Sequence, residues 1–526
     1  MSYKVLISDK LDTQAVEIFK AKGVEADFKP GLSAEDLLAC IDQYDGLAVR
    51  SATTVTPEVI AKAKNLKVIG RAGIGVDNID VKAATNAGMI VMNTPFGNSI
   101  TTAEHAIAMM VSLARQIPEA NESTHAGKWE KKKFMGTELF NKTLGVIGCG
   151  NIGAIVADRA LGLKMNVIAF DPFLSEERAV EIGVEKVELE TVFKRADFIT
   201  IHVPKNEHTA GLINAQAIAQ MKDGVRIINC ARGGIIIEDD LKAGLESGKV
   251  AGAALDVFEV EPANENVLFG MPNVVCTPHL GAATSEAQVN VAIQVAEQMA
   301  DYLMSGAITN ALNMPSISAE DAPRLKPYIK LAEQLGSFAG QITEDAIEGI
   351  NIEYEGTVAE INTKPLTSAL VANLMGCQLE SVNMVNAMSL AQARGIRISE
   401  TTSGSSKDWR SVIKVTIATA QGDRMVAGTL FTGEEPRLVN IEGVPIEVAI
   451  AKNMLFVRNA DQPGLVGGIG QILGEAGHNI ADFRLGRIEG ANQAICIVSL
   501  DEPLSDPLFQ SITDLEQIKG ARRLSF

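Results

Sequence analysis

The sequence predicts an α/β protein with two doubly wound parallel-sheet domains, followed by an α+β intervening domain and a small α+β terminal domain. Three observations support this prediction. Short apolar strands alternate with helical patterns over residues 4–93 and again over 144–280, as is typical of parallel sheets with crossover helices. The chain changes character after residue 315. Its last segment has the order strand-helix-strand-strand-helix-strand.

Length and composition agree with several globular domains. A chain of 526 residues exceeds what one hydrophobic core normally supports. Hydrophobic residues make up 46% of the chain and charged residues 21%, as in ordinary globular proteins. The formal net charge of −18 argues against a general nucleic-acid binder, which needs a basic surface. An anionic substrate must therefore meet a local group of cations.

The cysteines are scattered, without C-x-x-C spacing or histidines at zinc-ligand spacing. They are Cys40, Cys149, Cys230, Cys276, Cys377 and Cys496. We expect reduced, mostly buried thiols, no metal site and a cytoplasmic protein. An apolar strand begins at residue 5, so we expect no signal peptide, and no apolar run is long enough to span a membrane.

The first alternation predicts a flavodoxin-like domain. Its expected strands are 5–8, 24–28, 46–50, 68–72 and 90–93, and its expected helices are 12–21, 33–40, 57–63 and 81–87. A long helix over 101–115 leads out of this domain. We assign to it the helix at 285–304 and the exit at 310–315, so residues 1–98 and 285–315 form one unit and 99–284 the next.

The second alternation contains a dinucleotide-binding fingerprint, which predicts a Rossmann domain. Gly148 permits a tight turn after a buried strand, Gly150 lets the backbone approach a pyrophosphate, and Gly153 lets the following helix pack closely on the sheet. Asp171 ends the next strand, where a carboxylate would bind a ribose 2′-hydroxyl and repel a 2′-phosphate. The pattern therefore favours NAD over NADP.

Later strands of this domain end in polar or glycine-rich turns. These strands are expected at 198–203, 225–229, 252–256 and 274–277. Ligands of open α/β sheets bind outside the carboxyl ends of the strands, so the turns should converge on the dinucleotide.

Three of these turns supply Arg232, Glu261 and His279. Oxidation of a 2-hydroxy acid needs a base for the hydroxyl proton, and His279 is suited to accept a proton near neutral pH. Glu261 would orient the ring and favour its charged form. Arg232 offers a planar fork for a carboxylate. The other histidines are expected to be mainly structural: His105, His125, His202, His208 and His478.

The remainder of the chain carries no catalytic motif. Acids and prolines over 316–327 are typical of a linker. Residues 316–451 then mix helical pieces at 330–338 and 366–375 with strand-like segments at 347–353, 412–418 and 425–432. The segment 453–526 predicts a ferredoxin-like unit, with strands at 453–458, 480–487, 493–500 and 521–526 and helices at 465–475 and 508–517.

Residues 229–234, 254–262 and 277–281 resemble the three signatures of NAD-dependent D-2-hydroxyacid dehydrogenases. Residues 50–54, 70–78 and 93–99 narrow the resemblance to the long-form D-3-phosphoglycerate dehydrogenases. The terminal unit is similar to an ACT amino-acid-sensing domain. The resemblance covers essentially the whole chain.

The resemblance implies a substrate-binding domain at 1–98 with 285–315, an NAD-binding domain at 99–284 and an ACT regulatory domain at 453–526. It implies Arg232 as a substrate-binding and catalytic residue, Glu261 as the partner of His279, and His279 as the proton acceptor. The implied NAD contacts are Gly148, Gly150, Asn151, Ile152, Gly153, Asp171, Cys230, Ala231, Arg232, Asp256, His279, Leu280, Gly281 and Ala282.

The implied substrate, 3-phospho-D-glycerate, carries a phosphate and a carboxylate. The expected substrate-binding residues are Arg50, Ser51, Arg71, Gly73, Ile74 and Gly75. Backbone N–H groups near Gly73 would form an anion-binding nest. The family also suggests a homodimer or homotetramer in which the lysine run 131–133 reaches a neighbouring subunit's site, although a solvated face explains that run equally well.

The resemblance further implies that the protein opens L-serine biosynthesis and is regulated by L-serine, the end product of that pathway. Asn459, Asp461 and Asn479 stand where ACT domains bind a free amino acid. Ordinary turn chemistry before Pro463 is the simpler explanation for Asp461. Two other functions stay open at this stage: a glyoxylate or hydroxypyruvate reductase, and an NAD-sensing corepressor without catalysis.

Overall fold

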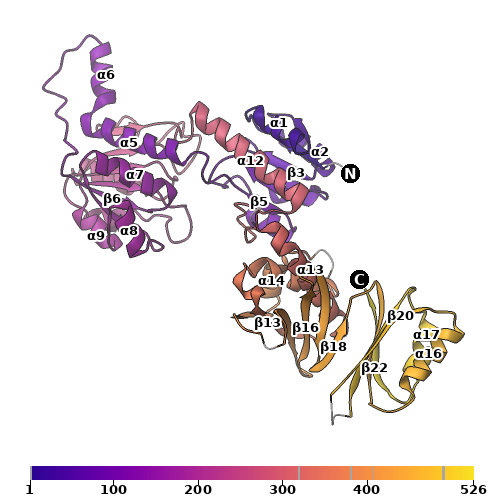
Figure 1. The fold of residues 1–526 in the computed structure, drawn as a ribbon. Coiled ribbons are helices and arrows are strands. Elements are labelled where there is room, and N and C mark those ends of the chain that lie inside the picture. Colours follow the sequence, from indigo (N-terminus) through magenta and orange to yellow (C-terminus); the bar gives the residue numbers. More distant parts are fainter. Residues whose placement is uncertain (1–2, 318–319, 380–381, 407, 489–491) are drawn as a thin grey trace.

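The computed structural model describes residues 3–317, 320–379, 382–406, 408–488 and 492–526. Four sheets form an extended array in which the first sheet lies between the second and the third, and the fourth lies at the end beside the third (Figure 1). The start of the chain at residues 1–2 and residues 318–319 of the expected linker lie outside this description. Among the described helices, none has the length and apolar character needed to cross a membrane.

The first sheet is parallel and has the order β2-β1-β3-β4-β5, which is the flavodoxin-like order. Its strands are β1 (Lys4–Ile7), β2 (Glu25–Phe28), β3 (Gly46–Val49), β4 (Val68–Arg71) and β5 (Ile90–Met92). Its crossover helices are α1 (Gln14–Ala21), α2 (Ala34–Cys40), α3 (Pro57–Lys62) and α4 (Val81–Asn86), with a short 3-10 turn η1 (Ile41–Gln43).

Helix α12 (Ser285–Ser305) comes from far along the chain and packs on this first sheet. A Cβ atom at Gly70 would lie 2.2 Å from the sulfur of Met299, so only glycine lets α12 approach β4 this closely. The later segment therefore completes the core of the first sheet.

The second sheet is also parallel and has the order β12-β11-β10-β9-β6-β7-β8. Its strands are β6 (Thr143–Ile147), β7 (Asn166–Phe170), β8 (Glu185–Lys186), β9 (Phe198–Ile201), β10 (Val225–Asn229), β11 (Val250–Leu255) and β12 (Val274–Cys276). Its helices are α5 (Ser99–Arg115), α6 (Ile117–His125), α7 (Asn151–Gly162), α8 (Glu176–Ile182), α9 (Leu189–Arg195), α10 (Ala215–Gln220) and α11 (Glu238–Glu246). The strand order reverses between β6 and β9, which makes their carboxyl ends the expected dinucleotide site.

The linker expected over 316–327 is wrong in its second half. Helix α13 (Ala322–Ile342) begins inside it and contains Pro327. Apolar residues of α13 at helical spacing, such as Leu325 and Leu335, are buried, and this burial outweighs the backbone hydrogen bond that Pro327 cannot donate. Ile317, at the start of the expected linker, pairs with Ile308 through two backbone hydrogen bonds.

The third sheet is mixed, with the order β14-β13-β15-β16-β17-β18. Its strands are β13 (Ile347–Gly356), β14 (Arg397–Ser403), β15 (Ser411–Thr419), β16 (Arg424–Phe431), β17 (Glu435–Ile441) and β18 (Val444–Val448). It carries α13, the 3-10 turn η2 (Thr357–Glu360), α14 (Lys364–Gly376) and α15 (Ala387–Ala393). A Cβ atom at Gly336 would lie 2.1 Å from the carbonyl oxygen of Leu370, so α13 and α14 touch backbone to backbone.

The fourth sheet is antiparallel, with the order β20-β21-β19-β22, which confirms the ferredoxin-like fold. Its elements are β19 (Asn453–Asn459), α16 (Leu465–Glu475), β20 (Ile480–Arg487), β21 (Ala494–Leu500), α17 (Asp506–Thr513) and β22 (Ile518–Ser525). Figure 1 shows both helices on one face of the sheet. Phe456 of β19 meets Phe338 of α13 edge to face, with ring centroids 6.0 Å apart, so the terminal unit shares a core with α13.

Candidate active site

The glycine turn of the second sheet has the geometry that a dinucleotide requires. Gly148 adopts a φ of 90°. A Cβ atom at Gly153 would lie 2.0 Å from the carbonyl oxygen of Gly148, whereas a Cβ atom at Gly150 would meet nothing within 4 Å. Helix α7 begins at Asn151, beside Ile152, and no side chain caps its first turn. Its free N–H groups and the open space beside Gly150 fit a pyrophosphate.

Asp171 follows β7 and braces this turn. Its carboxylate accepts a hydrogen bond of 2.8 Å from the backbone N–H of Cys149 and another of 2.8 Å from that of Phe173. The carboxylate therefore stands at the end of β7 in a fixed orientation beside the glycine turn. The contact with a ribose hydroxyl remains a prediction.

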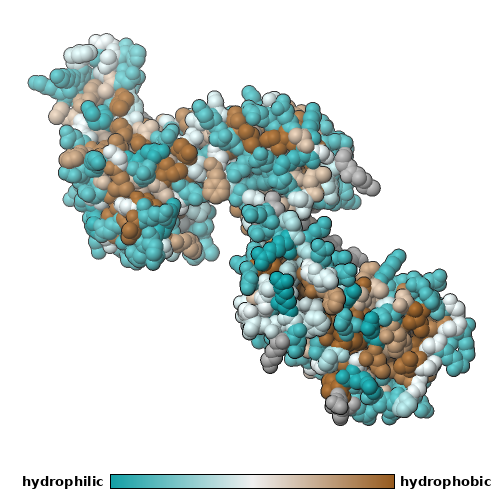
Figure 2. Space-filling view, in the orientation of Figure 1, coloured by the Kyte–Doolittle hydropathy of each residue, from teal (hydrophilic) through white to brown (hydrophobic). Residues whose placement is uncertain are grey.

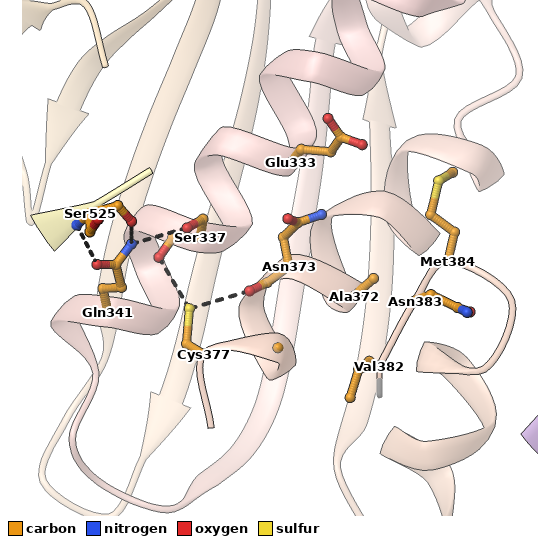
Figure 3. A pocket seen from close by; sticks show the side chains of 11 residues that line it. Glu333, Ser337, Gln341, Ala372, Asn373, Cys377, Val382, Asn383, Met384 and Ser525 are labelled. Carbon is orange, nitrogen blue, oxygen red and sulfur yellow. Dashed lines mark hydrogen bonds between the residues drawn. The ribbon is translucent and has the colours of Figure 1, made fainter. Parts of the chain in front are cut away.

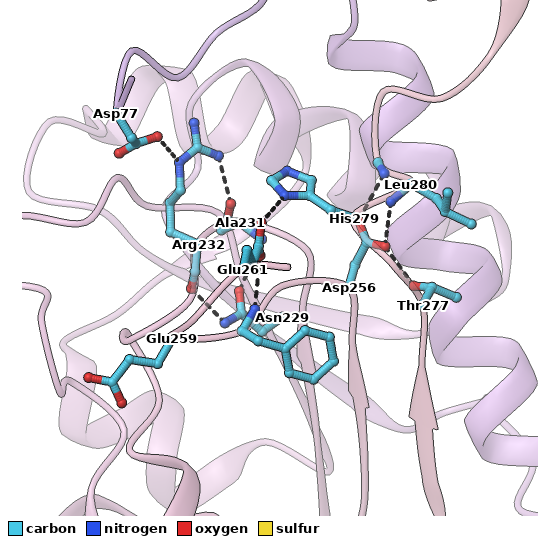
Figure 4. A network of polar contacts seen from close by, with 12 residues as sticks. Asp77, Asn229, Ala231, Arg232, Asp256, Glu259, Glu261, Thr277, His279 and Leu280 are labelled. Carbon is cyan, nitrogen blue, oxygen red and sulfur yellow. Dashed lines mark hydrogen bonds and ion pairs between the residues drawn. The ribbon is translucent and has the colours of Figure 1, made fainter. Parts of the chain in front are cut away.

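Arg232 lies in a turn that is held by Asn229 at the end of β10. The Asn229 side chain donates to the carbonyl oxygen of Arg232 over 2.9 Å and accepts from the N–H of Ala231 over 3.0 Å. The guanidinium donates through Nε to Asp77 over 2.9 Å and through Nη1 to the carbonyl oxygen of Ala231 over 2.7 Å (Figure 4). Asp77 belongs to the loop after β4, so Arg232 bridges the first and second sheets.

His279 and Glu261 form a hydrogen-bonded pair. His279 Nδ1 lies 2.7 Å from Glu261 Oε2, and Glu261 Oε1 accepts from the N–H of Phe258 over 3.0 Å. Burial raises the pKa of Glu261, but the hydrogen bonds from His279 and Phe258 outweigh it, so the pKa lies below its ordinary value. The carboxylate stays charged and fixes Nδ1 of His279, which leaves Nε2 free to exchange a proton (Figure 4).

The wholly buried Asp256 holds the loop that carries His279. Its carboxylate accepts from Thr277 Oγ1 over 2.6 Å and from the N–H groups of Leu280 and Gly281 over 2.7 and 2.8 Å. His105 of α5 lies 3.1 Å away through Nε2. Burial raises the pKa of Asp256, but hydrogen bonds from these partners, His105 first, bring it below its ordinary value.

His105 is therefore more than a packing residue, and its contact with Asp256 was not foreseen. No local pattern reveals it, because α5 and the 277–281 loop are far apart in the sequence. Helix α5 also buries Ser99 and Thr102, so a polar residue among its inward-facing positions does not single out His105.

Three arginines converge at the carboxyl end of the first sheet. Burial, followed by the charges of Arg232 and Arg50, lowers the pKa of Arg71 to about 10. Arg71 Nε is buried without a hydrogen-bond partner among the described residues. Such crowded cations favour an anionic ligand.

Two glycines make room for these arginines. A Cβ atom at Gly73 would lie 1.6 Å from Arg71 Nη1, and one at Gly75 would lie 1.4 Å from Arg232 Nη2. Ile74 lies between them, and its carbonyl oxygen accepts from the side chain of Asn93 over 2.6 Å.

The loop that presents Arg50 and Ser51 is held by Asp9, which the sequence patterns did not reveal. The buried carboxylate of Asp9 accepts from the N–H groups of Arg50, Ala52 and Thr53 over 2.5, 3.1 and 3.2 Å. The loop conformation is thus fixed before any ligand binds.

Known proteins resemble this chain over almost its full length. A D-3-phosphoglycerate dehydrogenase from Synechocystis is 45% identical over 520 residues, covering 98% of this chain and 94% of that protein. One from Bacillus subtilis is 42% identical, covering 99% of each. The family model of the D-3-phosphoglycerate dehydrogenase intervening domain matches residues 324–442. The chain belongs to the D-3-phosphoglycerate dehydrogenase family.

Further similarities support this membership. The family model for the NAD binding domain of D-isomer specific 2-hydroxyacid dehydrogenases matches residues 107–281. A glyoxylate reductase from Paecilomyes thermophila covers 59% of this chain and 98% of its own, with 31% identity and a TM-score of 0.56. An NAD+-bound 3-phosphoglycerate dehydrogenase from Entamoeba histolytica covers 60% and 99%, with 29% identity and a TM-score of 0.51. The chain is an NAD-dependent oxidoreductase of this family.

The remaining predicted site residues lie in different settings. Cys230 is buried, and burial raises the pKa of its thiol. Leu280 is 40% exposed and Ala282 half-buried, both next to the Asp256 network.

The lysine run 131–133 lies in an exposed segment after α6, where Lys133 pairs with Glu130 over 3.6 Å. Figure 1 shows α6, which precedes this segment, projecting from the second sheet.

The three predicted regulatory residues already have partners within the terminal unit. Asn459 is buried and donates to the carbonyl oxygen of Ala460 over 2.8 Å, while its Oδ1 has no partner in the described chain. Asp461 lies 3.7 Å from Arg487. Asn479 donates to Asp501 over 2.7 Å. No hydrogen bond joins the three to one another among the described residues.

His105→Leu should lower turnover and destabilise the fold at neutral pH. The variant removes the side-chain hydrogen bond to Asp256, so the pKa of Asp256 rises toward its ordinary value. A carboxyl group with a lowered pKa stabilises the fold above about pH 4, and this contribution is lost as the pH falls. We expect the variant to be less stable by about 1–2 kcal/mol at pH 7. Urea unfolding and turnover between pH 4 and 8 measure both effects.

The control for this prediction is His208→Leu, because the side chain of His208 is 84% exposed. It should leave both the turnover and the free energy of unfolding unchanged. A wild-type free energy of unfolding at pH 7 in His105→Leu would contradict the role of His105.

Proposed function

We propose that this chain oxidises 3-phospho-D-glycerate to 3-phosphohydroxypyruvate with NAD, the first step of L-serine biosynthesis. The proposal depends chiefly on one observation: the His279–Glu261 pair, at 2.7 Å, stands at the strand ends with Arg232, which reaches the loop after β4. The full-length relatives named D-3-phosphoglycerate dehydrogenase support it.

In this proposal His279, Glu261 and Arg232 each have a separate role. His279 Nε2 takes the proton of the C2 hydroxyl, while Glu261 holds Nδ1 and stabilises the imidazolium that forms. NAD, held by the glycine turn after β6 and by Asp171, would supply the hydride acceptor for C2. Arg232 binds the substrate carboxylate with Nη2, which has no hydrogen-bond partner within the described chain.

The NAD site in this proposal is formed by residues at the strand ends of the second sheet. The turn at Gly148, Gly150 and Gly153 and the start of α7 bind the pyrophosphate, and Asp171 binds the ribose. Cys230 and Ala231, together with the loop through Leu280 and Gly281, line the nicotinamide side. Residues 1–98 with 285–315 bind the substrate and residues 99–284 bind NAD.

Arg50 and Arg71, with Ser51, hold the phosphate in this proposal. The N–H of Gly73 already donates to the carbonyl oxygen of Arg71 over 3.0 Å, so the following N–H groups, of Ile74 and Gly75, would bind the substrate carboxylate. A chain with a net charge of −18 repels anions at long range, so only a dense local group of cations can hold a doubly charged phosphate. The same group is unnecessary for glyoxylate or hydroxypyruvate, which favours the phosphorylated substrate over these alternatives. A corepressor without catalysis would not need the His279–Glu261 pair.

The first experiment compares 3-phosphoglycerate with unphosphorylated D-glycerate. We expect kcat/KM to be higher for the phosphorylated substrate by a factor of about 100 or more, since charge-assisted contacts to phosphate are worth several kcal/mol. Steady-state assays with NAD measure the ratio. Equal values would favour a reductase of the same family, and no turnover of either would favour the corepressor.

His279→Ala should abolish most turnover while leaving the cofactor site intact. Loss of a general base typically costs a factor of 100 to 10,000 in kcat. Titration of NADH fluorescence should give nearly the same dissociation constant in variant and wild type. His125→Ala, a change on α6, is the control for both measurements. Undiminished turnover in His279→Ala would show that another group is the base.

We also propose that the chain works as a homodimer or homotetramer. Large apolar side chains are exposed on the second domain, including Trp129 at 86% and Met135 at 79%. Val466 and Leu485 are exposed on the terminal unit, where apolar residues gather on the visible face in Figure 2. Exposed apolar surface of this kind favours self-association. The unpaired cysteines support a cytoplasmic location.

L-serine is the proposed effector of the terminal unit, residues 453–526. Asn459, with its unpaired buried Oδ1, ends β19, Asp461 follows that strand, and Asn479 precedes β20. Serine must replace the Asn479–Asp501 hydrogen bond or bind beside it. Its amino group would donate to Asp461 and its polar ends would bond to Asn479.

A serine titration tests this regulation. We expect millimolar serine to inhibit the wild type. Asn479→Ala should weaken inhibition roughly tenfold, because it removes one or two hydrogen bonds to serine. Calorimetry on the full chain gives the binding constant directly. The absence of both heat and inhibition would leave the terminal unit as an assembly element. Inhibition that survives Asn479→Ala would place the serine site elsewhere.

A further inference from the structure

A cavity of about 600 Å³ lies outside the active site, between α13 and α14. Figure 3 shows its wall: Glu333 and Ser337 from α13, Asn373 from α14, Asn383 from the loop that follows, and Ser525 from β22. Small residues such as Ala372 and Gly376 leave the space open. Its volume is in the range of small-molecule sites.

The wall offers unpaired hydrogen-bond acceptors. Within the described chain, no hydrogen bond or ion pair reaches the carboxylate of Glu333, and burial raises the pKa of this group. Lys330, one helical turn earlier, opposes that shift by its charge but forms no ion pair with Glu333. Asn373 donates its amide to the carbonyl oxygen of Ala369 over 2.9 Å, which leaves its Oδ1 free.

The donors in the wall are mostly used. Gln341 donates to Ser337 Oγ and to the carbonyl oxygen of Ser525, over 3.1 and 3.0 Å. Asn383 donates to the carbonyl oxygen of Gly88 over 3.0 Å. The described wall contains no lysine, arginine or histidine. A ligand that satisfies it must supply donors and positive charge.

We propose that this cavity binds a small organic ammonium compound that carries no carboxylate or phosphate. The ammonium group donates to the Glu333 carboxylate and to Asn373 Oδ1, and hydroxyl or amide groups of the ligand meet the remaining polar wall. An anionic group is excluded because Glu333 repels it and no cation of the wall binds it.

The position of the cavity makes its occupant a contact between three parts of the chain. The side chain of Asn383 donates to the carbonyl oxygen of Gly88 in the first domain. A Cβ atom at Gly88 would lie 1.9 Å from the side-chain nitrogen of Asn383. Gln341 and Ser525 exchange two hydrogen bonds, which joins α13 to the last strand. A ligand bound between these groups stabilises the junction of the first domain, the third sheet and the terminal unit.

The test uses two probes of similar size on the full chain: 2-amino-1,3-propanediol and glycerol. We expect calorimetry to show saturable binding of 2-amino-1,3-propanediol at millimolar concentration or below, and no heat from glycerol. Glu333→Gln should weaken that binding at least tenfold, the worth of a charge-assisted hydrogen bond. Glu434→Gln, an exposed acid in the same domain, should leave it unchanged.

Asn479→Ala serves to separate this cavity from the proposed serine site. Binding of 2-amino-1,3-propanediol should be the same in this variant as in the wild type. The proposal is overturned if this amine gives no heat, if glycerol binds equally well, or if Glu333→Gln binds the amine as tightly as the wild type does. Binding that Asn479→Ala abolishes would also overturn it, because the terminal unit would then hold the amine.

Discussion

The loop that carries His279, the proposed base, depends on the buried carboxylate of Asp256. A buried charge is tolerated only when hydrogen bonds replace the water that it has lost, and Asp256 collects them from Thr277, Leu280, Gly281 and His105. These bonds join the end of β11 to the turn after β12 and to α5. His279 therefore takes its position from an anion that lies beneath it, in addition to its direct partner Glu261. Helix α5 also leads from the first domain to the second, so the junction of the domains and the catalytic loop share one polar network.

Much of this organisation could be predicted from the sequence because its signals are local. The glycine spacing around Gly148, the acid at Asp171, and the polar turns after apolar strands each lie within a few residues of the element they define. The same is true of the alternation that gives both parallel sheets and of the ferredoxin-like order at the end. The trio Arg232, Glu261 and His279 follows from strand ends alone, since parallel strands bring their carboxyl ends together.

The rest depends on contacts between distant residues. Asp9 and Arg50 are 41 residues apart, Asp77 and Arg232 are 155 apart, and His105 and Thr277 are 172 apart. Nothing near Asp9 or Asp77 in the sequence distinguishes it from a surface acid. The start of α13 was hidden for a different reason: prolines and acids there are typical of linkers, and only its packing against α14 and the third sheet shows that the segment is helical. The strands β17 and β18 were missed because turn-like residues separate short, half-exposed segments.

The contact between Arg232 and Asp77 places an internal competitor for anions at the candidate active site. A carboxylate of the chain itself occupies part of the guanidinium that the proposed substrate needs, so a ligand gains affinity only by the difference between its own interaction and that of Asp77. Weak monoanions gain little from such an exchange. A ligand with a second anionic group, held at the same time by Arg50 and Arg71, offsets the loss. The ion pair would thus select for doubly anionic ligands. It also holds the first and second domains in contact until such a ligand binds.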